Sequence, residues 1–146
     1  MTNPRSMNAE DLVAYLHPDD RPDPQHAVSA ACQVTELLRY LALATDDAWR
    51  SLPAPAVAND VALALRDGLP ALAEILRHLA ARHEEFAADA RLAAYDTGET
   101  HPGGASFYAA AAAIELTTAA GDVDQLTHRL HTATAHTGMI YLPDAR

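Results

Sequence analysis

The amino-acid sequence predicts an all-α protein, a single-domain helical bundle of five or six helices. Apolar residues make up 49% of the 146 residues, but aromatic residues make up only 5%, so alanine supplies much of the apolar total. Alanine has the best intrinsic helix propensity, whereas valine and isoleucine, which favour strands, are few. Apolar side chains also recur at steps of three and four, the spacing of one helix face.

Two predicted helices lie on either side of a linker that is rich in proline and charge. The first is a short helix over residues 7–16, and Pro18 ends it. The second covers residues 24–48, because Asp23 is a suitable N-cap and a proline follows at the first helical position. Apolar residues at steps of three and four form its buried stripe: Val34, Leu37, Leu38, Leu41, Ala44 and Ala48.

The middle of the chain is predicted to form two helices, over residues 56–66 and 68–95. The segment Asp67-Gly68-Leu69-Pro70 separates them, because glycine suits a helix end and proline is tolerated in a first turn. The longer helix carries an apolar row with alternating steps of three and four, as in a coiled-coil seam. This row consists of Leu69, Leu72, Leu76, Leu79, His83, Phe86 and Ala90.

Two more helices are predicted after a flexible loop over residues 96–104. The helix over 105–120 contains five consecutive alanines, and Gly121 closes it. A capping box then starts the helix over 123–137. A single domain therefore covers residues 1–146. Residues 1–22 are its N-terminal helix and linker, 23–137 its bundle and 138–146 its apolar C-terminal tail.

Composition excludes several classes of function. The net charge is −10 and all ten basic residues are arginines scattered among carboxylates, which disfavours nucleic acid and anionic membranes as partners. The absence of lysine, together with abundant alanine, indicates a GC-rich bacterial gene. The single Cys32 excludes an internal disulfide and a multi-cysteine zinc site. The N-terminal sequence lacks an apolar signal region, so a soluble cytoplasmic protein is expected.

The stretch RHLAARHEEF, residues 77–86, contains two histidines, two arginines and two glutamates within ten residues. Within it, Arg77 precedes His83 by six positions. This spacing resembles the motif of HEPN-type ribonucleases, small helical domains that are often dimeric. The resemblance implies an RNA-cleaving enzyme in which Arg77 and His83 gather around a phosphate.

Helix geometry favours a structural interpretation of the same stretch. Each helical residue turns by about 100°, so Arg77 and His83 lie about 120° apart, on different faces. His78 and His83 diverge too far to share a metal, and the pair His128 and His131 is expected on the solvent side. We therefore expect no metal and no cofactor, and a His83 that packs in the core or at an interface.

The sequence thus predicts a non-enzymatic protein that acts through helix-mediated self-association, most simply as a homodimer, or by binding another protein. The predicted interface consists of Leu69, Leu72, Leu76, Leu79, His83 and Phe86. The competing arrangement has the tail and the second helix covering this row within one chain. Two alternative functions remain open: the HEPN-like ribonuclease or toxin-type enzyme, and a small-molecule-binding bundle. The aromatic residues proposed for such a pocket are Tyr15, Tyr40, Trp49, Phe107 and Tyr108.

Overall fold

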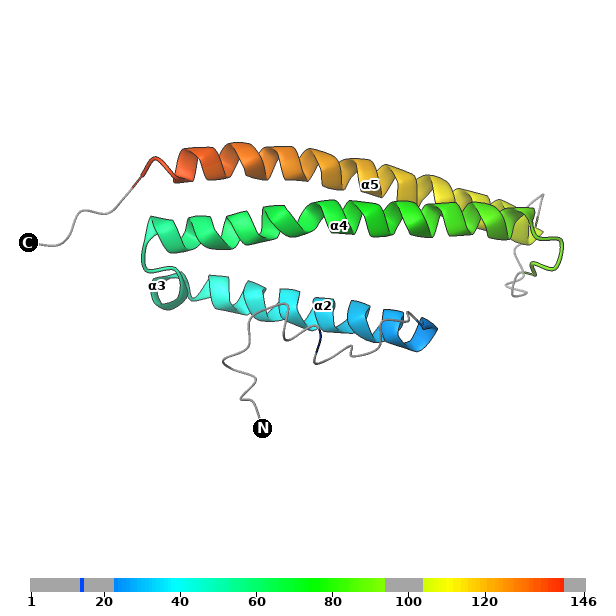
Figure 1. Cartoon of the computed structure of the whole chain (residues 1–146), viewed down its shortest axis with the longest axis horizontal. Coiled ribbons are helices and arrows are strands. Elements are labelled where there is room, and N and C mark those ends of the chain that lie inside the picture. The colour runs from blue at the N-terminus through cyan, green and yellow to red at the C-terminus, as the bar shows by residue number, and fades with distance from the viewer. Residues whose placement is uncertain (1–13, 15–22, 94–103, 141–146) are drawn as a thin grey trace, which may run out of the picture. The chain divides into compact units, whose positions relative to one another are not determined.

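The computed structural model describes residue 14 and residues 23–93 and 104–140, apart from the side chains of residues 48 and 49. Helices dominate these residues and no strand occurs among them, which confirms the all-α fold class. The chain divides into two compact units, residues 1–51 and residues 52–146, and each is described here by itself (Figure 1). The single-domain organisation stays a prediction.

The first unit contains α2 (Pro24–Asp46) and the four-residue helix α3 (Ala48–Ser51). The side chain of Asp23 caps α2: its Oδ1 accepts hydrogen bonds from the backbone N–H groups of Gln25 at 2.7 Å and His26 at 2.9 Å. The predicted start of this helix is therefore confirmed. No residue of α2 is buried among the described residues.

The second unit is built around a helical hairpin. It contains α4 (Pro55–Ala88) and α5 (Gly104–Thr137), each 34 residues long. Figure 1 shows the two helices running antiparallel, side by side along their whole length. The structure describes both ends of this long contact. Any functional surface described in this unit is therefore built on the hairpin.

The prediction of five or six helices is wrong. Over the described residues the chain forms three long helices and the short α3. The predicted break at residues 67–70 does not occur, and α4 runs through Pro70. The predicted end at Gly121 does not occur either, and α5 runs through that glycine. The helix predicted over 7–16 lies outside the described residues except for Ala14, and of the tail only residues up to Ile140 are described.

Packing along the hairpin explains why both helices continue. A proline inside a helix costs about 3 kcal/mol and a glycine about 1 kcal/mol relative to alanine. These are local costs, whereas the contact between α4 and α5 extends on both sides of Pro70 and of Gly121. In addition, Pro70 and Gly121 are themselves exposed. Neither residue therefore disturbs the contact between the two helices.

Small side chains form the seam between the two helices. The buried positions are occupied by alanines and one threonine: Ala73, Ala80, Ala109, Ala113, Ala120 and Thr134. Most of them are spaced by seven residues, as in a coiled coil. The hydroxyl of Thr134 is satisfied, because it donates to the backbone oxygen of Leu130 at 2.9 Å. With no large side chain fully buried, the backbones of α4 and α5 can approach closely.

Candidate functional site

The structure divides the predicted leucine row of α4 into two. Leu69, Leu76 and His83 are half-buried on the side of α4 that meets α5. Leu72 and Leu79 remain 43% and 46% exposed. Residues three apart differ by about 60° around a helix, whereas residues seven apart point in nearly the same direction. One partner helix therefore covers the first row and leaves the second row open.

The open row belongs to a wider apolar surface, which we call the apolar face. On α4 it includes Leu65 and Ile75 beside the two exposed leucines, and on α5 it includes small residues and one leucine. Helix geometry places the leucines of α4 and the residues of α5 roughly 70–110° from the seam, with Ile75 further round α4, and because the helices are antiparallel, the two offsets point to the same side of the hairpin. The apolar face consists of Leu65, Leu72, Ile75, Leu79, Ala112, Ala119 and Leu126.

The opposite side of the hairpin is polar. Arg77 of α4 forms an ion pair with Asp124 of α5 across it. Nearby, the guanidinium of Arg66 donates to the carboxylate of Asp67 at 2.6 and 2.8 Å. These groups border a shallow hollow, whose lining residues are Arg66, Asp67, Pro70, Asp124, Thr127, His128 and His131. The hairpin is thus two-sided, with the ion pair between α4 and α5 on one side and the apolar face on the other.

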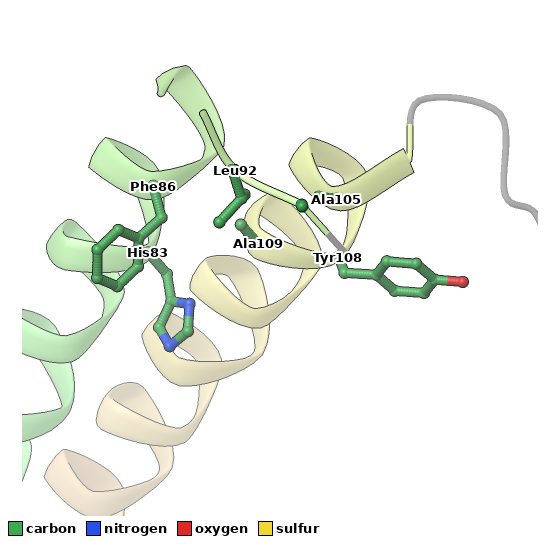
Figure 2. Close-up of a pocket in the computed structure, with 7 residues that line it drawn as sticks. His83, Phe86, Leu92, Ala105, Tyr108 and Ala109 are labelled. Carbon is green, nitrogen blue, oxygen red and sulfur yellow. The ribbon is translucent and has the colours of Figure 1, made fainter. Parts of the chain in front are cut away.

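Arg77 and His83 do not share a site. Arg77 is held by Asp124 on the polar side, whereas His83 lines a different hollow of about 240 Å³ at the loop end of the hairpin (Figure 2). The His83 ring meets the Phe86 ring edge-on, with 5.8 Å between centroids. Arg82, the nearer arginine, lies over Phe86 at 4.4 Å from the ring centroid. This arrangement does not gather an arginine and a histidine around one phosphate.

The aromatic residues suggested for a ligand pocket are separated or only partly described. Phe107 and Tyr108 contact each other edge-on at 5.8 Å. In Figure 2 the Tyr108 ring extends away from His83 and Phe86. Tyr40 is exposed on α2, while the structure does not describe Tyr15 or the side chain of Trp49. The hollow next to His83 is lined by one leucine and three alanines together with His83, Phe86 and Tyr108.

The remaining histidines and the composition of the helices bear on metal binding and on membrane spanning. His78 lies 3.8 Å from Glu74 in an exposed pair on α4. His128 and His131 share the polar hollow. Over residues 23–93 and 104–140, no group of three or more His, Cys, Asp and Glu side chains is arranged to hold a metal ion. In the same part of the chain, no helix is both long enough and apolar enough to cross a bilayer.

Sequence reasoning missed the contribution of α5 to the apolar face. Apolar helix faces are recognised in a sequence by rows of large side chains, and Ala112 and Ala119 are too small to stand out in such a row. Their signal is the spacing of seven residues that links them to Leu126. Comparison with known proteins finds no relative. No protein-family model, curated protein or solved structure matches the chain significantly.

Proposed function

We propose that this protein is a non-enzymatic association module that pairs with a second copy of itself through the apolar face of the α4–α5 hairpin. The observation that supports the proposal most directly is the open row of α4. Leu65, Leu72 and Leu79 are each at least 40% exposed and follow one another at intervals of seven residues. A continuous exposed apolar row of this kind is typical of interfaces rather than of solvated surface.

Two helices alone bury little apolar surface, and the seam of this hairpin buries mainly alanines. Pairing two hairpins face to face would give a four-helix bundle, in which the leucine rows become the shared core. Two-fold pairing is the commonest form of association in soluble proteins, because one self-complementary patch is enough.

The charged side chains favour a protein partner over RNA. Arg77 is engaged by Asp124, and Arg82 by Glu85, so neither is free for a phosphate. The chain's net charge of −10 repels a polyanion. No contact of Arg77 or Arg82 therefore supports the HEPN-like ribonuclease.

Sedimentation equilibrium at micromolar concentration tests the proposal. We expect wild type to sediment as a dimer and the double variant Leu72→Glu/Leu79→Glu to sediment as a monomer, because two carboxylates on each copy would have to be desolvated at the interface. The matched control is Ile114→Glu. Ile114 is 66% exposed on the side of α5 that is turned away from α4, so this variant should remain dimeric.

Circular dichroism must show that all variants keep the helicity of wild type. A wild type that is monomeric under these conditions would contradict the proposal. The face would then be covered within one chain or by another protein.

A further inference from the structure

We propose that the α4–α5 hairpin contains a hinge at the level of Pro70 and Gly121, about which its open end separates while its loop end stays closed. The open end is the one where α4 begins and α5 ends (Figure 1). The open-end half consists of residues 55–69 and 122–137, and the loop-end half of residues 71–88 and 104–120. This inference does not depend on the proposed self-association.

The interior prolines and glycines of both helices lie at one level of the hairpin. They are Gly68 and Pro70 of α4 and Gly121 of α5. The hollow beside Pro70 is lined across the hairpin by side chains between residues 124 and 131, and the hollow beside His83 by side chains between residues 105 and 109. Counting along the antiparallel helices from these two hollows places the three residues within about two turns of one another.

Each of these residues lowers the resistance of its helix to bending. Pro70 has no N–H to donate to the carbonyl oxygen four residues earlier, and its ring crowds that carbonyl. The two glycines lack the Cβ atom that restricts a helical backbone. Sharp bends in helices occur mostly at prolines. Because the three residues share one level, both helices bend most easily at the same place.

Buried side chains lie almost entirely on the loop side of this level. The loop-end half contains five residues that are at most 8% exposed: Ala73, Ala80, Ala109, Ala113 and Ala120. In the open-end half, Thr134 is the one buried residue among those described. The loop-end half is therefore held by a continuous packed seam, whereas the open-end half loses little packing when its helices separate.

Polar groups replace alanine in the seam of the open-end half. Asn59 precedes Ala73 by fourteen residues, or two heptads, so it lies on the same side of α4. Its Oδ1 atom is buried but accepts no hydrogen bond within the described residues. The Thr134 hydroxyl donates to its own helix, at 2.9 Å from the oxygen of Leu130, and so does not join α5 to α4. Separation of the helices lets water bind the unpaired oxygen, which lowers the free-energy cost of opening.

Contacts near the hinge leave this movement free. The Arg77–Asp124 ion pair joins α4 to α5 close to the hinge level, where a bend separates the helices least. The polar hollow has a volume of about 640 Å³, is lined in part by Pro70 and lies on the open-end side of this level. The space beside the hinge is therefore not filled by packed side chains.

Spin-label distances within one chain test the hinge in a Cys32→Ser background. One labelled pair, Ala56→Cys with His136→Cys, spans the open end, and a matched pair, Glu84→Cys with Ala110→Cys, spans the loop-end half. All four positions are exposed, and the two on α4 lie fourteen residues on either side of the hinge proline. Dilution with unlabelled protein removes distances between copies.

Pulsed electron paramagnetic resonance gives the distance distribution of each labelled pair. An arm of about 22 Å that bends by about 20° moves its end by roughly 8 Å. We expect the distribution of the open-end pair to extend to longer distances by about that amount, and that of the loop-end pair to be narrow.

Replacing the hinge residues should close the open end. We expect Pro70→Ala/Gly121→Ala to narrow the open-end distribution to the width of the loop-end one, because the missing backbone hydrogen bond returns and the freedom of the glycine is lost. A Cβ atom at position 121 meets no atom within 4 Å, so this change adds no clash. Pro70→Ala alone serves as the second variant and should narrow the distribution in part.

Equal widths for the two labelled pairs in wild type would overturn the hinge. A broad open-end distribution that neither variant narrows would also overturn it, because the ends would then fray instead of bending at this level. Hydrogen exchange supplies the remaining measurement. Amides of residues 60–66 should stay protected, since a bent helix keeps its hydrogen bonds, and exchange there at the rate of an unfolded chain would contradict the proposal.

Discussion

The helix α2 and the α4–α5 hairpin have similar apolar patterns but different surroundings. Both carry apolar residues at steps of three and four. The hairpin buries alanines between two long helices, whereas α2 buries no residue among those described, and Leu37 and Leu38 are 58% and 52% exposed. The comparison teaches that an amphipathic pattern specifies a helix and its apolar side, while the partner that covers this side depends on side-chain size and register.

Enlarging a buried alanine between α4 and α5 should destabilise the hairpin. Ala73 is completely buried between α4 and α5, so Ala73→Leu forces extra methyl groups into a close-packed contact. We expect the free energy of unfolding to fall by about 1–3 kcal/mol. Urea denaturation followed by circular dichroism measures the change.

The matched control for this substitution is Ala42→Leu on α2. Ala42 is exposed, so the same change in volume should alter stability by less than about 0.5 kcal/mol. Equal losses for the two variants would contradict the distinction between a packed seam and an exposed helix.

Two prolines sharpen the comparison with an effect of opposite sign. Pro70 lies inside α4, where its ring excludes one backbone hydrogen bond, whereas Pro24 lies in the first turn of α2, where no such bond is lost. We expect Pro70→Ala to raise the free energy of unfolding by about 2 kcal/mol: roughly 3 kcal/mol of helix propensity less the gain in unfolded-chain entropy.

Pro24→Ala is the control and should leave stability nearly unchanged. Both values come from urea denaturation at neutral pH. A Pro70→Ala variant no more stable than wild type would mean that the helix around residue 70 is not continuous.

The smallest effect is expected at the N-terminus of α2. The backbone N–H of His26 donates to the Asp23 carboxylate and, together with that of Gln25, holds the pKa of Asp23 below its ordinary value. Because the folded pKa is the lower one, the stabilisation is complete above the unfolded value of about 4 and is lost as pH falls through the folded value. We expect acid fraying of α2 in that window, seen as a small loss of helicity by circular dichroism.

Asp23→Asn keeps the capping oxygen but cannot titrate, so its helicity should be less sensitive to acid than that of wild type. Asp23→Ala should show the frayed helix already at neutral pH. If the asparagine variant lost helicity with pH as strongly as wild type, another carboxylate would be responsible.

The sequence by itself determined that the protein is helical and where α2 begins. Alanine content and the spacing of apolar residues act within one or two turns, and the Asp23 cap acts within three residues, so these features can be read locally. The sequence also identified Leu72 and Leu79 as apolar residues in need of a partner. The self-association proposed from these leucines stays a prediction, because neither the sequence nor the structure tests it.

Only the tertiary structure decided that Pro70 and Gly121 lie inside continuous helices and that the leucine row of α4 splits between a covered and an open side. Local rules weigh a proline or a glycine against its nearest neighbours, whereas the hairpin sums packing over 34 residues of each helix, and that sum outweighs a single unfavourable position. The row splits for a related reason. Which side of α4 is covered depends on the small residues of α5, which lie some 40 positions away in the sequence and become its neighbours only when the chain folds back.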